Sequence, residues 1–237
     1  MSKRRSQKQA ARFVREQLAR ERVRRRRLIL SAVAAAVLLA AGLVGWAVYV
    51  NQRPSGYQTP ATATKQADGL TIGTGPATVE VYLDFQCPAC RQFEDSAGAT
   101  LDKLVADKKI TLVYHPLAFL DRASTTRYST RSAASAGCAA DAGKLAPYVK
   151  VLYQRQKPEG GPGLSDDELV AAATSAGITD AGFATCLHDG KYAGWVTHVT
   201  DAAVQRGINA TPTVSVNGKQ VDATAAAVQA AVDAAAG

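Results

Sequence analysis

Two thiols stand three positions apart in a Cys-Pro-Ala-Cys segment, where Pro88 and Ala89 separate Cys87 from Cys90. A pair at this spacing can close into a disulfide and open again, which is the chemistry of thiol-disulfide exchange. The attacking species in that exchange is a thiolate, so one of the two sulfurs needs surroundings that lower its pKa. The spacing therefore predicts a redox site whose reactivity depends on the elements that hold it.

The elements around the pair are predicted to be a strand followed by a helix. Residues 78–85 are rich in β-branched and aromatic side chains, as in a strand packed within a sheet. Pro88 suits the first position of a helix, and apolar residues recur every four positions from Phe93 onward. Cys87 is thus expected at a helix N-terminus, where free N–H groups and the helix dipole stabilise a thiolate. Cys90, one turn on, is placed to resolve a mixed disulfide.

Zinc binding is the first alternative for this pair, because a Cys-x-x-Cys pair is also half of a zinc site. The chain has two further cysteines, Cys138 and Cys186, but they stand far apart and form no second paired knuckle. We therefore predict no metal site. A purely structural Cys87–Cys90 disulfide is also disfavoured, because so short a loop gains little chain entropy. No phosphate loop, paired carboxylates or nucleophilic serine motif stands out, and no bound cofactor is predicted.

The first 50 residues differ in composition from the rest of the chain. Residues 1–27 hold 12 Lys+Arg and 2 Asp+Glu, and the remaining residues are slightly acidic, so the tail alone accounts for the whole-chain charge of +8. Residues 28–50 carry no charge, and as a helix they would span roughly 34 Å, enough for a hydrocarbon core of about 30 Å. Arginines before this run favour a cytoplasmic N-terminus, and Trp46 and Tyr49 suit the outer interface. We predict a basic cytoplasmic tail over 1–27 and a single transmembrane helix over 28–50.

A cleaved signal peptide is the alternative to an uncleaved anchor. The basic region is long, the apolar run exceeds the usual length of about 7–15 residues, and no small-x-small site follows directly after Val50. An anchor is therefore favoured, and either arrangement places the domain outside the cell membrane. The anchor accounts for the basic tail, so no nucleic-acid partner is expected. Residues 51–76 hold Pro, Gly, Thr and Ala with little large apolar content, and are predicted to be a flexible linker.

Residues 77–237 have the element order of an α/β domain. The 123–207 block is rich in Ala with helical spacing, and Ser165 followed by Glu168 is typical of a helix cap. An Asn-Gly turn joins the last two strands. The elements predicted after the redox helix are a strand at 109–115, the helical block at 123–207, strands at 213–216 and 220–221, and a helix from 223. This order predicts a thioredoxin-like sheet with a helical insertion.

Two motifs of this chain resemble those of the membrane-anchored DsbA-like thiol-disulfide oxidoreductases of the thioredoxin superfamily. The resemblance is carried by the Cys-Pro-Ala-Cys segment and by residues 207–218, which read Gly-Ile-Asn-Ala-Thr-Pro-Thr-Val-Ser-Val-Asn-Gly. It covers residues from about 69 to the C-terminus. Either motif alone is moderately specific, and the two in this order are strongly so.

The resemblance implies a role for each residue of the two motifs. Cys87 would be the nucleophile and Cys90 the more buried resolving thiol, with Pro88 and Ala89 between them as supporting residues. Pro212 would be a cis proline that faces the pair, and Thr211 would present backbone groups to an extended substrate strand. From the residues alone, Pro212 could equally be a trans proline that starts a strand.

Two positions depart from the family pattern. In this fold a buried carboxylate often lies six residues before the nucleophile, and that position is Val81 here. Strand alternation points Glu80 and Asp84 to the other face from Val81, so neither is an obvious replacement. The second departure is Ala89, where strongly oxidising relatives carry a histidine. Without a histidine donor at this position, the Cys87 thiolate should be less stable. We therefore expect a milder oxidant than those relatives.

The other two cysteines, Cys138 and Cys186, are predicted to form a structural disulfide within the helical insertion. In an exported domain two otherwise solitary cysteines most often pair. Closing this loop would stabilise the fold by roughly 4 kcal/mol on the chain-entropy model. A second redox pair that relays electrons to Cys87 and Cys90 is the alternative, although neither cysteine has a Cys-x-x-Cys neighbour.

These features together predict a membrane-tethered oxidase that donates its disulfide to reduced or unfolded exported proteins. The family resemblance implies reoxidation by a quinone-linked membrane thiol oxidase. An isomerase or reductase would use the same pair, and Thr211 does not distinguish them. Such an isomerase usually carries a dimerisation domain, for which residues 51–77 are too short. A non-catalytic module that binds a partner near Pro212 is a third hypothesis, disfavoured by the intact cysteine pair.

Overall fold

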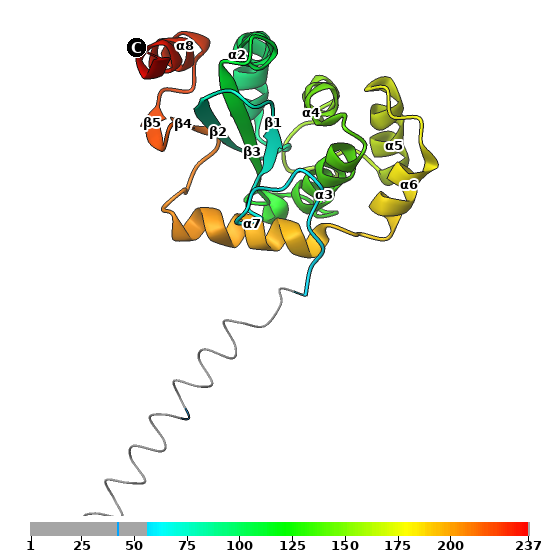
Figure 1. Cartoon of the computed structure of the whole chain (residues 1–237). Coiled ribbons are helices and arrows are strands. Elements are labelled where there is room, and N and C mark those ends of the chain that lie inside the picture. Colours follow the sequence, from blue (N-terminus) through cyan, green and yellow to red (C-terminus); the bar gives the residue numbers. More distant parts are fainter. Residues whose placement is uncertain (1–41, 43–55, 237) are drawn as a thin grey trace, which may run out of the picture. The chain divides into compact units, whose positions relative to one another are not determined.

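The computed structural model describes Gly42 and residues 56–236, and the account below concerns 56–236 (Figure 1). The predicted tail at 1–27 and, apart from Gly42, the predicted membrane helix at 28–50 lie outside the described residues. Within the part that is described, no helix combines the length and the apolar character needed to cross a membrane.

The domain is built on a five-stranded sheet in the order β1-β3-β2-β4-β5. The central strand β2 runs parallel to β3 and antiparallel to β4, while β1 and β5 pair antiparallel with β3 and β4 at the two edges. The strand bounds are β1 Leu70–Ile72, β2 Ala77–Leu83, β3 Ile110–Pro116, β4 Thr213–Val216 and β5 Lys219–Val221. The strands predicted from the β-branched runs are confirmed to within a few residues.

Helices cover both faces of this sheet. The redox helix α2, Pro88–Ala106, packs with the C-terminal helix α8, Ala225–Ala236, while α7, Ala193–Gln205, packs against β3 (Figure 1). Figure 1 shows the sheet between α7 and the α2–α8 pair. Val79 and Val81 of the central strand are fully buried. A strand covered on both sides needs such continuous apolar character, which is why β2 reads as an apolar run.

The predicted helical insertion is also confirmed. It consists of α3 Tyr128–Asp141, α4 Leu145–Gln154, α5 Asp166–Ser175, α6 Ala181–His188 and α7. Nearly every residue of α3 is buried, because α4, α5, α6 and α7 surround it and its Ala, Ser and Gly side chains permit close packing. The predicted helix cap is present as a capping box at the start of α5. Through α4, which packs on α2, the insertion contacts the redox helix.

The flexible linker predicted over 51–76 falls into two parts. Residues 51–55 lie outside the described residues, and residues 57–76 fold onto the domain instead of forming a linker. β1 pairs with β3, and Leu70 within it is fully buried. The indole nitrogen of Trp195 donates to the carbonyl of Ala67 over 2.6 Å, and the Ala61 amide donates to Asp141 over 2.8 Å. All these partners come from distant parts of the sequence. A composition of Pro, Gly, Thr and Ala therefore gave no sign of them.

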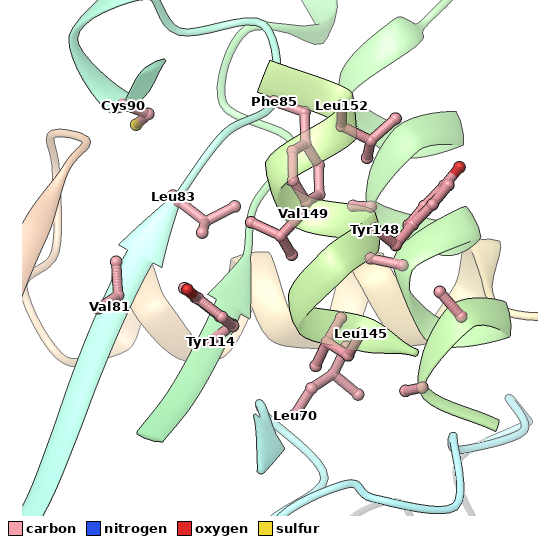
Figure 2. Close-up of a cluster of buried hydrophobic side chains, with 14 of the residues drawn as sticks. Leu70, Val81, Leu83, Phe85, Cys90, Tyr114, Leu145, Tyr148, Val149 and Leu152 are labelled. Atoms are coloured by element: carbon pink, nitrogen blue, oxygen red, sulfur yellow. The ribbon is translucent and has the colours of Figure 1, made fainter. Parts of the chain in front are cut away.

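One apolar core joins the sheet to the insertion (Figure 2). Phe85, just after β2, lies beside Val149 and Leu152 of α4, and its ring is 5.3 Å from that of Tyr153 between centroids. Cys90 belongs to the same core. The insertion is thus packed against the segment that leads into the cysteine pair.

Candidate active site

Cys87 occupies the position that the sequence predicts, at the N-terminus of α2. It is the N-cap residue, with φ −74° and ψ 120°, and Pro88 takes the first helical position. Both thiols are free in this structure. Cys90 is only 1% exposed and Cys87 is 7% exposed, whereas Pro88 and Ala89 between them lie on the surface.

The two thiols have opposite acidities. The pKa of Cys87 is lowered from 9.0 to about 5, above all by a hydrogen bond from the Cys90 thiol, then by Thr211 and by the N–H groups of Cys90 and Ala89, against the effect of burial. The pKa of Cys90 is raised far above its ordinary value by burial first and by the neighbouring Cys87 next. At neutral pH the pair is therefore a thiolate at Cys87 and a thiol at Cys90.

The second motif of the sequence lies against the first. The Thr211–Pro212 peptide bond is cis, and both residues are half-buried immediately before β4. As a thiol, Cys87 donates to the carbonyl oxygen of Thr211 over 3.4 Å, across 124 positions of sequence. The antiparallel pairing of β4 with β2 makes this contact possible, since β2 ends just before the cysteines.

Asp84 is a buried carboxylate of this site. The prediction from strand alternation, that Asp84 is no replacement for the missing carboxylate, is therefore wrong. β2 ends at Leu83, so alternation does not extend to Asp84. Its side chain is fully buried and accepts hydrogen bonds from the Gln86 amide at 2.9 Å, the Leu120 amide at 3.0 Å and the Ser129 hydroxyl at 2.7 Å. Burial raises its pKa from 3.8 to about 6, and Cys87 is close enough to contribute to the rise.

Glu80 lies elsewhere, as alternation predicts. It accepts a hydrogen bond from the Ser215 hydroxyl at 2.9 Å and lies 3.3 Å from Nε2 of the buried His115. The nearby His115 imidazole is the main reason that the pKa of Glu80 is lowered. Glu80 therefore belongs to a polar cluster on the sheet rather than to the cysteine pair.

Side chains from the helical insertion hold the backbone around the pair. The Tyr153 hydroxyl donates to the Asp84 carbonyl at 3.3 Å, and the Gln156 amide donates to the carbonyls of Phe85 and Cys87 at 2.9 and 3.0 Å. The Asp84 carbonyl also accepts from the Cys87 amide at 3.0 Å. No motif marks Tyr153 or Gln156 in the sequence, and only the packing of α4 brings them here.

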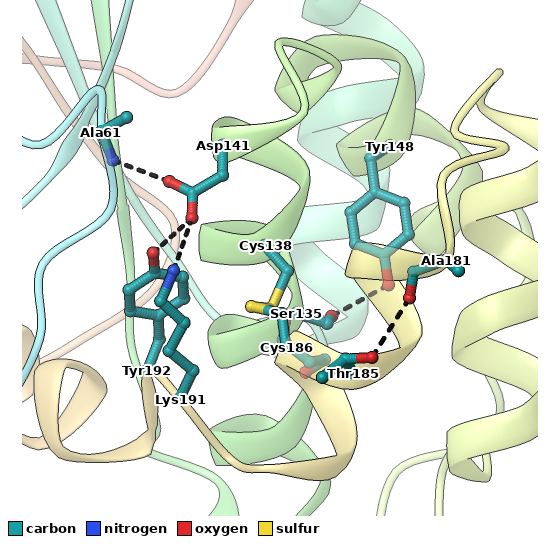
Figure 3. Close-up of a disulfide and its surroundings, with 11 residues drawn as sticks. Ala61, Ser135, Cys138, Asp141, Tyr148, Ala181, Thr185, Cys186, Lys191 and Tyr192 are labelled. Carbon is teal, nitrogen blue, oxygen red and sulfur yellow. Dashed lines mark hydrogen bonds and ion pairs between the residues drawn. A yellow bond between two sulfur atoms is a disulfide. The ribbon is translucent and has the colours of Figure 1, made fainter.

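Cys138 and Cys186 form a disulfide between α3 and α6 (Figure 3). Close to it, Asp141 accepts hydrogen bonds from the Ala61 amide and from Lys191, which joins the start of the domain to the insertion. The disulfide thus lies among contacts that hold the insertion together, and it is separate from the Cys87 site.

A thioredoxin-like sheet that holds a low-pKa cysteine at a helix start, with a second thiol buried behind it, defines a thiol-disulfide oxidoreductase. The family model described as Thioredoxin matches residues 65–234, and this chain belongs to that family. Within it the chain is DsbA-like, as the comparison with solved structures shows.

One similar structure is the crystal structure of reduced DsbA from Mycobacterium tuberculosis, whose sequence is 32% identical to this chain. The match covers 72% of this chain and 93% of the DsbA chain, with a TM-score of 0.64. The reduced disulfide bond oxidoreductase DsbG from the same organism is 32% identical, with coverages of 74% and 86% and a TM-score of 0.62. A curated relative, the serine/threonine-protein kinase PknE of Mycobacterium tuberculosis, is 32% identical over 157 residues. That match is 62% of this chain, and it spans only 28% of the kinase's length.

Proposed function

We propose that this chain is a membrane-tethered oxidase that introduces disulfides into exported proteins through Cys87 and Cys90. The observation that carries the proposal is the contrast between the two sulfurs. A pKa of about 5 makes the Cys87 thiolate a stable product of disulfide donation. Because the reduced form is stabilised in this way, the Cys87–Cys90 disulfide is readily donated to a substrate.

The reaction starts from the oxidised enzyme. A substrate thiolate attacks the sulfur of Cys87, the Cys87–Cys90 bond breaks, and Cys90 takes up a proton as its high pKa requires. The second substrate thiolate then attacks the substrate sulfur of the mixed disulfide and releases Cys87 as a thiolate. The substrate dithiol has lost two electrons to the enzyme, which leaves in the dithiol form. In this step the low pKa of Cys87 makes it a good leaving group.

Substrate binding would use the surface around Thr211 and Pro212. These residues are half-buried beside Cys87 and lie outside the strand ladder, which starts at Thr213. A backbone segment of this kind can pair with an extended peptide without reading its sequence. Reduced or unfolded chains offer such peptides, and they are the substrate class that we propose.

The enzyme needs an acceptor for the two electrons that it gains. We propose a quinone-linked membrane thiol oxidase as that acceptor, and a location at the cell membrane with the catalytic domain outside. The basic residues at 1–27 and the uncharged run at 28–50 support this arrangement. Tethering would raise the effective concentration of enzyme and acceptor in the plane of the membrane.

The reduction potential of the Cys87–Cys90 pair tests the direction of the reaction. It is measured for the full chain in detergent, equilibrated with glutathione, with the state of each cysteine read by mass spectrometry. We expect a value above the about −270 mV of thioredoxin and below the about −120 mV of DsbA, because Ala89 offers no side-chain donor. A value at or below that of thioredoxin would instead make the protein a reductant.

The anchor is tested separately in intact cells. The full chain should resist extraction from membranes at alkaline pH, and its catalytic domain should be cleaved by external protease after removal of the cell wall. The matched control replaces Leu38 and Leu39 by Arg, which costs about 3 kcal/mol each in the middle of a membrane helix. If the wild-type chain extracts as readily as this control, the anchor proposal fails.

A further inference from the structure

Gln156 connects the helical insertion directly to the nucleophile residue. It lies just past the end of α4, and its Nε2 donates to the carbonyl of Phe85 at 2.9 Å and to that of Cys87 at 3.0 Å. A primary amide has two N–H groups, so both donors are used on the backbone that enters α2. The contact spans 69 positions of sequence to Cys87.

We infer that Gln156 is a positioning residue that sets the acidity of Cys87, so that the helical insertion tunes the redox pair. This inference rests on the proposed role of Cys87 as the nucleophile. The acidity of Cys87 depends in part on the N–H groups of Ala89 and Cys90, which reach its sulfur only if the helix start is oriented correctly. By holding the carbonyls on either side of Gln86, Gln156 fixes the peptide planes that lead into the helix.

The electrostatics of the contact act in the same direction. The N–H end of an amide dipole carries partial positive charge, and here it faces the two carbonyls beside the thiolate. Pro88 has no N–H, so the backbone supplies one donor fewer at this helix start. Both Gln156 N–H groups point at carbonyls, so the side chain does not replace the missing donor and acts on the thiolate through its dipole and through the backbone that it holds.

Neighbouring contacts make the position well defined. Tyr153, one turn earlier, donates to the Asp84 carbonyl at 3.3 Å, and its ring packs against Phe85. The Cys87 carbonyl also accepts the first helical bond of α2, from the Arg91 amide at 3.3 Å. Without Gln156, the Cys87 carbonyl would keep only the Arg91 amide as a donor. The Phe85 carbonyl would lose the donor that Gln156 supplies.

The test compares two substitutions with a matched control. Gln156→Glu keeps the length of the side chain but replaces its donors by a negative charge, and Gln156→Met removes the donors without adding charge. Gln154→Glu makes the same charge change two residues earlier, on an exposed position. The acid dissociation constant of Cys87 is measured in the reduced full chain in detergent, from thiolate absorbance at 240 nm against pH. Melting temperatures are recorded in parallel.

We expect the acid dissociation constant of Cys87 to fall about tenfold in Gln156→Glu and about threefold in Gln156→Met, with little change in Gln154→Glu. The reduction potential should become less oxidising in the same order. The inference is overturned if Gln156→Met and any folded Gln156→Glu keep the wild-type constant, or if Gln154→Glu changes it equally. Failure of the proposed function would look different, since the reduction potential of the wild-type pair would then lie at or below that of thioredoxin, whatever the acidity of Cys87 in the variants.

Discussion

The two cysteine pairs of this protein differ in where their helices place them. Cys87 lies at the N-terminus of α2, whereas Cys138 and Cys186 both lie in the last turn of their helices, α3 and α6. The N-terminus of a helix offers free N–H groups and a positive dipole end, and the C-terminus offers carbonyls and a negative end. A thiolate is therefore stabilised at Cys87 and disfavoured at Cys138 and Cys186.

The difference teaches how one fold can hold one cysteine pair suited to exchange and another suited to a structural role. Exchange needs a good leaving thiolate, and at a helix C-terminus that thiolate leaves poorly. Cys138 is only 3% exposed and Cys186 is half-buried, so an external thiol has limited access to one of the two sulfurs. We propose a structural role for the Cys138–Cys186 bond on these grounds, and five predictions can break or sharpen the contrast.

The largest expected effect is the loss of activity on replacing Cys87. Cys87→Ser should lower the rate of oxidation of a reduced dithiol peptide by roughly a thousandfold or more, because the Cys87–Cys90 disulfide that accepts the two electrons can no longer form. The double variant Cys138→Ala with Cys186→Ala should keep most of the wild-type rate at a temperature where it is folded. A loss in the double variant as large as that in Cys87→Ser would show that the second pair relays electrons.

The stability of the reduced protein should depend on pH through Cys87. Its pKa is about 5 when folded against 9.0 ordinarily, so the thiolate stabilises the fold fully above pH 9 and loses this effect as pH falls through 5. The difference corresponds to about 5 kcal/mol across the window. Denaturant unfolding of the reduced and oxidised proteins, compared between pH 5 and pH 9, measures it. A gap between the two forms that stays constant with pH would contradict the assigned acidity.

Removing the second disulfide should affect stability rather than chemistry. The bond closes a loop between positions 48 apart, and the double alanine variant of Cys138 and Cys186 should be less stable by about 4 kcal/mol. Its denaturation midpoint gives the loss, and thiolate absorbance gives the acidity of Cys87, which should not change. A changed acidity would mean that the insertion transmits the state of this bond to the active site.

The smallest effect compares the carboxylates beside the two pairs. Asp84→Asn should cost about 1–3 kcal/mol, because an amide nitrogen would face a backbone N–H that now donates to an oxygen. At the pH of about 5 where Cys87 titrates, a carboxyl with a pKa of about 6 is already mostly protonated, so the pKa of Cys87 should change little in this variant. Asp141→Asn is the matched control near the second pair and should also leave the pKa of Cys87 unchanged. A clear fall in the pKa of Cys87 in Asp84→Asn alone would contradict the assigned order of the two pKa values.

The pH dependence of these two carboxylates runs in opposite directions. Burial raises the pKa of Asp84 to about 6, so the stability tied to its protonated form is present below pH 3.8 and is lost as pH rises through 6. The pKa of Asp141 is lowered by its hydrogen bonds, chiefly from Tyr192, against the effect of burial. The contribution of Asp141 to the free energy of unfolding is therefore present above pH 3.8 and is lost at lower pH. Each asparagine variant should remove the corresponding trend from the stability profile.

The sequence alone determined the parts of this protein that depend on local chemistry. The helix start at Cys87 follows from Pro88 and the apolar spacing after it, and the cap of α5 follows from Ser165 and Glu168. The strands and the Ala-rich insertion follow from β-branched runs and helical periodicity. These signals lie within a few residues of the elements that they specify, so they can be recognised without the fold.

The tertiary structure alone decided which distant groups surround the sulfurs. Asp84 could be recognised as buried only once β2 was seen to end at Leu83. Gln156 and the docking of residues 57–76 depend on partners many positions away, and neither leaves a local pattern. The physical reason is that desolvation and hydrogen bonding act through space. A pKa is set by whatever the fold brings within a few ångströms of the group.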